Sequence, residues 1–106
     1  MAYAILQAVE TAEFLNHNPN YVVVDVRTRP EWDEGHIPGA IHADVHAFHE
    51  HWDKLPADKS TPIVCICRVG GRSAMACELM AERGYTHLYN VEGGMLAYTG
   101  QVVIDD

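Results

Sequence analysis

The sequence lacks the features that mark several large classes of protein. Its 106 residues contain no run of about 18 consecutive apolar residues, so no membrane-spanning helix is expected. Only 7 residues are Lys or Arg, and the net charge of -8 disfavours binding to nucleic acid, whose phosphate backbone is met by clustered basic side chains. Three cysteines make an odd count, which argues against a framework of disulfide bonds.

The start of the chain also lacks a targeting signal. Residues 1–7 have no basic flank, and Glu10 and Glu13 follow closely, which is unlike a secretory leader. Because free thiols suit a reducing compartment, we expect a cytoplasmic protein. A chain of this length, without repeats or linker-like segments, predicts a single domain over residues 1–106.

What the sequence does contain is an alternation of short apolar runs and helical patterns. Strands are expected at 2–6, 21–26, 40–42, 63–67 and 87–91, and helices at 9–16, 30–34, 44–54, 72–83 and 95–99. The runs at 21–26 and 63–67 are almost continuously apolar, which is typical of strands buried on both faces of a parallel sheet. The pattern predicts an α/β domain with a mostly parallel sheet.

The strongest functional signal is a cysteine at the junction of a strand and a helix. The apolar run at 63–67 ends in Cys67, and a short loop containing Gly70 and Gly71 leads into the next expected helix. A thiol at such a junction faces backbone N–H groups and the positive end of the helix dipole, and both favour the reactive thiolate. Cys67 is therefore the predicted nucleophile. Asp25 ends the other apolar strand and should border the same crevice.

Two of the few basic residues, Arg68 and Arg72, flank this loop. Local positive charge on an acidic protein predicts a small anionic substrate at the loop. The alternative is that both arginines form ordinary surface ion pairs.

Three segments resemble the rhodanese (thiosulfate sulfurtransferase) family. Residues 25–27 and 31–42 are similar to the family's D-x-R followed by E-aromatic-x-x-G-H-I-x-G-A. Residues 67–73 resemble its active-site loop, C-R-x-G-x-R-S. Residues 91–98 resemble V-x-G-G-W-x-A-W more weakly, with methionine and tyrosine in place of the two tryptophans.

The resemblance implies a rhodanese-like domain, in which a mostly parallel five-stranded sheet has helices on both faces. It also implies sulfur transfer without a cofactor or metal. Cys67 would take the outer sulfur of a donor such as thiosulfate, hold it as a persulfide, and pass it to a thiol or cyanide. The implied substrate-binding residues are Arg68, Val69, Gly70, Gly71, Arg72 and Ser73. A partner protein that relays persulfide sulfur is a further expectation.

Within this picture the loop amides donate to the sulfur, the arginines orient the anion, and Ser73 either caps the helix or hydrogen-bonds the sulfur. Asp25, Arg27 and His36 are expected to support the site structurally, because a thiolate of low pKa needs no base. The alternative is that Asp25 or His36 acts as a general base.

Other candidate residues have plainer interpretations. Cys65 and Cys77 are expected to be core residues, with Cys65 as a resolving thiol the alternative. Four histidines gather in one region: His42, His46, His49 and His51. We expect a solvated surface there, since no C-x-x-C or H-E-x-x-H motif accompanies them, and metal binding is the alternative.

Two other functions compete with sulfur transfer. Cysteine phosphatases and arsenate reductases use C-x5-R, whereas Arg72 is the fifth residue after Cys67 and Ser73 the sixth. The loop is thus one residue short for phosphate. A non-catalytic interaction module would be expected to lack the cysteine, and Cys67 is present. The sulfur donor stays open among thiosulfate, a persulfide from a partner protein, and polysulfide.

Overall fold

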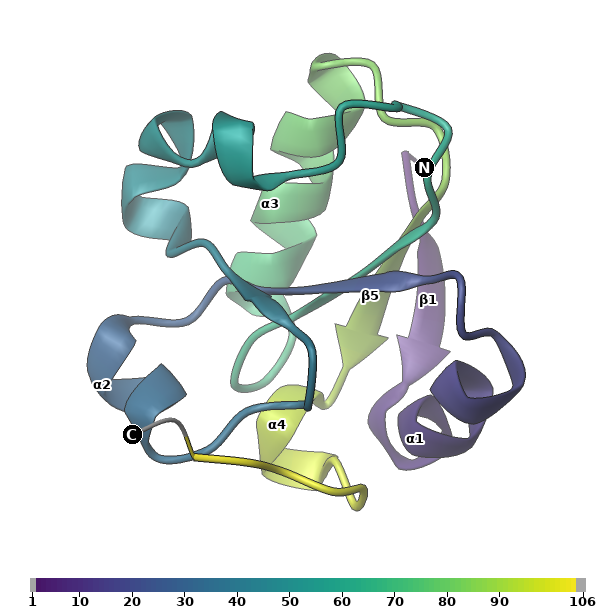
Figure 1. Ribbon diagram of the computed structural model, residues 1–106, viewed down its shortest axis with the longest axis vertical. Coiled ribbons are helices and arrows are strands. Elements are labelled where there is room, and N and C mark those ends of the chain that lie inside the picture. The colour runs from purple at the N-terminus through teal and green to yellow at the C-terminus, as the bar shows by residue number, and fades with distance from the viewer. Residues whose placement is uncertain (1, 105–106) are drawn as a thin grey trace.

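A computed structural model describes residues 2–104 and shows a five-stranded sheet in which all neighbouring strands run parallel (Figure 1). The strands are β1 (Ala4–Gln7), β2 (Val22–Asp25), β3 (Ile41–His42), β4 (Ile63–Ile66) and β5 (Leu88–Glu92). Their order across the sheet is β1-β5-β4-β2-β3, which puts β4 in the middle. The expected α/β class and the five strands are confirmed, with ends shifted by one or two residues.

Helices cover both faces of the sheet (Figure 1). They are α1 (Ala8–His17), α2 (Arg29–Asp33), α3 (Gly71–Glu82) and α4 (Gly94–Ala97), with two 3-10 helices, η1 (Val45–Glu50) and η2 (Trp52–Lys54). One apolar cluster joins the sheet to α3 and η1, and the other joins it to α1 and the segment around α4.

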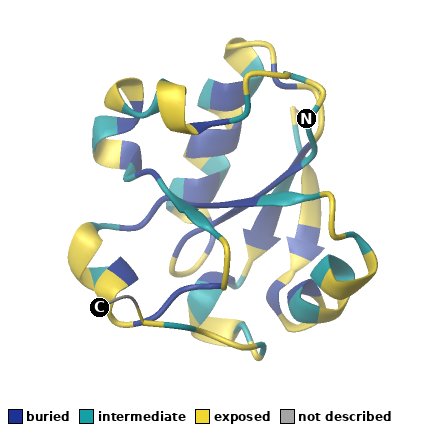
Figure 2. Ribbon diagram, in the orientation of Figure 1, coloured by how far each residue is buried: buried dark blue, intermediate teal, exposed yellow. Residues whose placement is uncertain are grey.

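The central strand shows why its sequence is continuously apolar. Every residue of β4 is fully buried, and Figure 2 shows buried residues through the middle of the sheet. Ile63 and Cys65 belong to the cluster beneath α3, whereas Val64 and Ile66 belong to the cluster on the opposite face. Because both faces of a parallel sheet are covered, alternation with polar residues would bury uncompensated polar groups.

The prediction of one helix over residues 44–54 is wrong. This segment forms the short 3-10 helices η1 and η2, and Ala47 inside η1 has non-helical angles of φ -129° and ψ 33°. The Asp44 carboxylate accepts a hydrogen bond from the His46 N–H and so caps the start of η1. Val45 and Phe48 still reach the core, because residues three apart lie above one another in a 3-10 helix.

Across residues 2–104, none of the helices combines the length and apolar character that crossing a membrane requires.

The short helix α4 holds the chain segment that follows β4. The Met95 N–H donates to the Cys67 carbonyl at 2.8 Å, and the Leu96 N–H donates to the Arg68 carbonyl at 3.0 Å. Gly94 allows this approach, because a Cβ there would lie 2.4 Å from the Arg68 carbonyl carbon and oxygen, and because its φ is +54°. The contact positions the residues directly after the central strand.

Substituting Gly94→Ala should therefore lower the free energy of unfolding by about 2–4 kcal/mol, since the methyl group meets backbone that cannot yield and the φ is unfavourable. Chemical denaturation measures the effect. Gly71→Ala is the matched control, because a Cβ at Gly71 meets nothing within 4 Å, and it should change stability by less than about 0.5 kcal/mol. Equal losses for the two variants would contradict this account of α4.

Candidate active site

Cys67 is the first residue after β4 and lies at the carboxyl end of the sheet, where β2 also ends at Asp25. The residue is fully buried, with 0% of its surface exposed. Its thiol is thus recessed beneath the loop that leads to α3. Any group that reacts with the sulfur must be small or narrow enough to reach into this recess.

Two groups of the loop donate hydrogen bonds to the Cys67 sulfur. The Gly70 N–H lies 3.0 Å from Sγ, and the Ser73 hydroxyl lies 3.3 Å from it. Burial raises the pKa of the Cys67 thiol, but the Ser73 hydroxyl and the backbone N–H groups of Ser73, Gly70 and Val69 outweigh it, so the pKa is lowered. The loop therefore favours the thiolate, as the sequence predicted.

Glycine at position 70 is a geometric requirement of this loop. Its φ is +120°, in the region that side chains other than glycine rarely adopt. This conformation turns the Gly70 N–H toward the sulfur and its carbonyl toward β5.

Asn90 of β5 is a site residue that the sequence did not reveal. Its Nδ2 donates to the Gly70 carbonyl at 3.1 Å, and its Oδ1 accepts from the Ser73 hydroxyl. The single hydroxyl proton of Ser73 can serve only one acceptor at a time: Asn90, the Gly70 carbonyl or the Cys67 sulfur. Asn90 thereby positions both groups that face the sulfur. Its only signal in the sequence was an amide within an apolar strand.

Of the two arginines that flank the loop, one is paired and one is exposed. Arg72 donates to both carboxylate oxygens of Glu31, from Nη1 at 2.7 Å and from Nη2 at 2.9 Å. Ser73 binds the sulfur and does not cap α3, whose first turn has no side-chain cap. Arg68 is exposed and forms no ion pair within residues 2–104, so it is the freer of the two for a small anion.

Asp25, Arg27 and His36 tie the neighbouring segments together. Arg27 forms a buried pair with Asp25, with the shortest contact at 2.8 Å, and donates to the Gly35 carbonyl at 2.7 Å. His36 stacks on Trp32 with ring centroids 3.5 Å apart, and its backbone pairs with Val103. These contacts join β2, α2 and the C-terminal segment.

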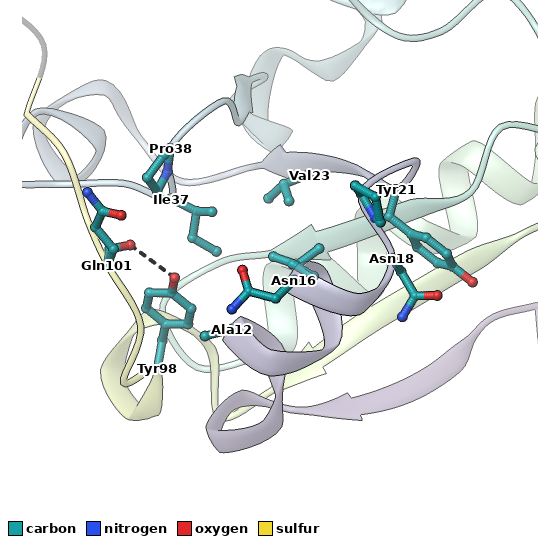
Figure 3. A pocket seen from close by; sticks show the side chains of 11 residues that line it. Ala12, Asn16, Asn18, Tyr21, Val23, Ile37, Pro38, Tyr98 and Gln101 are labelled. Carbon is teal, nitrogen blue, oxygen red and sulfur yellow. Dashed lines mark hydrogen bonds between the residues drawn. The ribbon is translucent and has the colours of Figure 1, made fainter.

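Two hollows in the surface differ in their relation to the loop. A small one of about 180 Å³ lies beside it, lined by Arg27, Glu31, Glu34, Arg68, Met95 and Leu96. A larger cavity of about 380 Å³ lies between α1 and the C-terminal segment, where Asn16, Ile37 and Tyr98 face the same space (Figure 3). None of the loop residues lines the larger cavity, so the reactive sulfur does not lie in it.

Cys65 and Cys77 are fully buried in the core, as expected. Burial raises the pKa of the Cys65 thiol well above its ordinary value, and the neighbouring Cys77 thiol adds to the effect. Cys65 therefore stays protonated, which makes it a poor partner for exchange with Cys67.

Three of the four histidines at 42–51 contact different partners, His49 lying 3.7 Å from Glu50, whereas the buried Nδ1 of His51 has no hydrogen-bond partner among the described residues. His42 stacks on Trp32 and contacts the Arg27 carbonyl at 2.8 Å, and His46 lies 2.9 Å from Asp44. Within the part of the chain that the structure describes, no three His, Cys, Asp or Glu side chains are placed to hold a metal ion.

The fold and the loop together define an α/β domain that carries an activated cysteine at the end of its central parallel strand. The family model of the rhodanese-like domain matches residues 8–101, and the chain belongs to this family. The resemblance noted in the sequence is confirmed.

Several curated relatives are sulfurtransferases. Putative sulfurtransferase YtwF of Bacillus subtilis is 40% identical over 79 residues, which cover 74% of each chain. A sulfurtransferase of Allochromatium vinosum is 34% identical over 77 residues, covering 73% of this chain and 70% of that protein. The tRNA uridine(34) hydroxylase of Chlamydia muridarum also matches at 34% identity, but this chain spans only 25% of its length.

Solved structures agree with the fold. A rhodanese-like domain protein of Staphylococcus aureus superposes with a TM-score of 0.85 at 27% identity, covering 97% of this chain and 99% of that one. A structure of rhodanese with anions from E. coli gives a TM-score of 0.71 at 27% identity and covers 80% of this chain and 99% of that one.

Removing the Ser73 hydroxyl should raise the pKa of Cys67, because the thiolate loses a hydrogen bond. In Ser73→Ala, the thiolate absorbance at 240 nm, taken as the difference from Cys67→Ser, should titrate at higher pH. Alkylation of Cys67 by iodoacetamide at pH 7 should slow by about threefold to tenfold. Ser60→Ala removes an exposed hydroxyl bound to Asp58 and should leave both unchanged. An unshifted titration in Ser73→Ala would show that Ser73 does not stabilise the thiolate.

Proposed function

We propose that this protein is a sulfurtransferase that moves sulfane sulfur from a small donor to a thiophilic acceptor through a persulfide on Cys67. One observation carries the proposal: the recessed Cys67 sulfur accepts hydrogen bonds from the Gly70 amide and the Ser73 hydroxyl, which lower its pKa. A buried sulfur that is stabilised as an anion is suited to nucleophilic attack and to holding a second, negatively charged sulfur.

The transfer has two steps. The Cys67 thiolate attacks the outer sulfur of thiosulfate, the bond between the two donor sulfurs breaks, and sulfite leaves with the electron pair. The persulfide anion then gives its terminal sulfur to cyanide, forming thiocyanate, or to a thiolate, forming a new persulfide. Cys67 returns as the thiolate in either case, so no oxidant, reductant or cofactor is consumed.

The geometry of the loop favours sulfur over phosphate. A phosphoryl group exposes three equatorial oxygens and needs an arginine that clamps them. Here Arg72, the arginine nearest that role, is paired with Glu31 through both terminal nitrogens. The loop is also one residue shorter than the C-x5-R pattern, so phosphatase and arsenate reductase functions are disfavoured.

The proposed donor and acceptor are chosen to fit the surroundings of the loop. The hollow of about 180 Å³ beside it suits a small anion such as thiosulfate, with exposed Arg68 at its edge. The acceptor is cyanide or a thiol, and a thiol on a partner protein that relays persulfide sulfur fits the same chemistry. We place this activity in the cytoplasm, where free thiols persist, and it requires neither nucleic acid nor membrane.

Incubation with thiosulfate should add one sulfur to the intact protein, a gain of about 32 Da that cyanide removes. Intact-mass spectrometry measures the gain, and Cys67→Ser should abolish it. Cys65→Ser is the matched control, since Cys65 is a buried core thiol of raised pKa, and it should keep most of the gain.

Two outcomes would contradict the proposal. A gain that survives in Cys67→Ser would place the sulfur on another thiol. A wild-type protein that takes no sulfur from thiosulfate or from an organic persulfide would favour a non-catalytic interaction module.

A further inference from the structure

The ion pair between Glu31 and Arg72 is a feature of the loop that nucleophilic attack by Cys67 does not itself require. The two side chains are joined by two parallel hydrogen bonds of 2.7 and 2.9 Å, the bidentate geometry that arginine forms best with a carboxylate. Only 27% of the Arg72 side chain and 21% of the Glu31 side chain are exposed. The pair is therefore partly shielded from solvent screening.

This pair persists throughout the neutral pH range. The hydrogen bond from Arg72 is the main cause that lowers the pKa of Glu31 to about 2, against a smaller opposing effect of burial, and Thr28 adds two further hydrogen bonds. The same contact raises the pKa of Arg72. The Asp44 carboxylate adds a smaller electrostatic contribution that also raises the pKa of Arg72.

The charge of Arg72 acts near the Cys67 sulfur, because Arg72 directly precedes Ser73, whose hydroxyl lies 3.3 Å from that sulfur. A donor that approaches the thiolate brings negative charge toward negative charge. An arginine free of its carboxylate would attract a doubly charged donor more strongly than a singly charged one. Glu31 removes most of that distinction.

We propose that Glu31 sets the charge preference of the donor site: by occupying Arg72 it weakens the binding of a dianionic donor relative to a monoanionic donor of the same shape. The inference rests on the proposed sulfur transfer by Cys67. Glu31 acts through Arg72 and is a positioning residue. Arg68 and the loop amides remain to receive the anion.

Two sulfur donors of similar shape and different charge separate the effect of donor charge on kcat/KM from the effect of donor shape. Thiosulfate is a dianion, and methanethiosulfonate carries a methyl group in place of one oxygen and is a monoanion. With either donor the Cys67 thiolate takes the outer sulfur, and the leaving group is sulfite or methanesulfinate respectively. The ratio of the two kcat/KM values therefore reports how the site responds to the additional charge.

Glu31→Gln is the principal test. Glutamine keeps the third-position partner of the capping box that begins α2, so the helix should be preserved. The thiosulfate to methanethiosulfonate ratio should rise by about threefold to tenfold, because one negative charge near the site is lost. Added salt should reduce this rise. Asp33→Asn removes an exposed carboxylate from the same helix and should leave the ratio unchanged.

Arg72→Gln tests the same inference from the other side of the ion pair. The unpaired Glu31 carboxylate should lower the ratio, and the double variant Glu31→Gln, Arg72→Gln should return it toward the wild-type value. Circular dichroism and thermal unfolding check that each variant is folded.

An unchanged ratio in Glu31→Gln, or an equal loss of activity with both donors, would overturn the inference and leave Glu31 with only a role in loop shape. A wild-type protein that loads Cys67 from neither donor would instead count against the proposed function.

Discussion

The hydrogen bond from the Gly70 amide to the Cys67 sulfur exists because the chain reverses direction within three residues of a fully buried strand. That reversal leaves backbone carbonyls facing inward, and each needs a donor. Backbone N–H groups of α4 donate to the carbonyls of the first two residues of the turn. The Asn90 side chain donates to the Gly70 carbonyl. The reactive sulfur is thus held by contacts from β4, β5 and α4, which lie far apart in the sequence.

Two arginine–carboxylate pairs tie β2, α2 and the loop together. The buried pair of Asp25 and Arg27 fixes the end of β2 to the segment after α2. The pair of Glu31 and Arg72 then fixes α2 to the loop. The bidentate geometry of both pairs strengthens their hydrogen bonds and offsets the cost of removing the charges from water. Three of the seven basic residues of this acidic chain, Arg27, Arg68 and Arg72, thus lie at or beside the loop.

The features that could be predicted from the sequence are local, whereas those that could not are contacts between residues far apart in the chain. Strands at 21–26 and 63–67 were readable because burial on both faces demands an unbroken apolar run. The segment at 44–54 was misread, because spacing of three suits a 3-10 helix as well as an α-helix. Pairings between distant positions left no local mark: Arg72 meets Glu31 across 41 positions, and Asn90 meets Ser73 across 17. Cys67 itself was evident from its place at the end of a strand.

One oxygen of Glu31 links local and long-range order. Oε1 accepts from the Thr28 N–H, from the Thr28 hydroxyl and from Arg72. A helix of five residues such as α2 is too short to persist alone, because its nucleation is costly and few hydrogen bonds repay it. Fraying of α2 and loosening of the loop above Cys67 therefore belong to one cooperative opening event, so amide protons in both segments should exchange with solvent together.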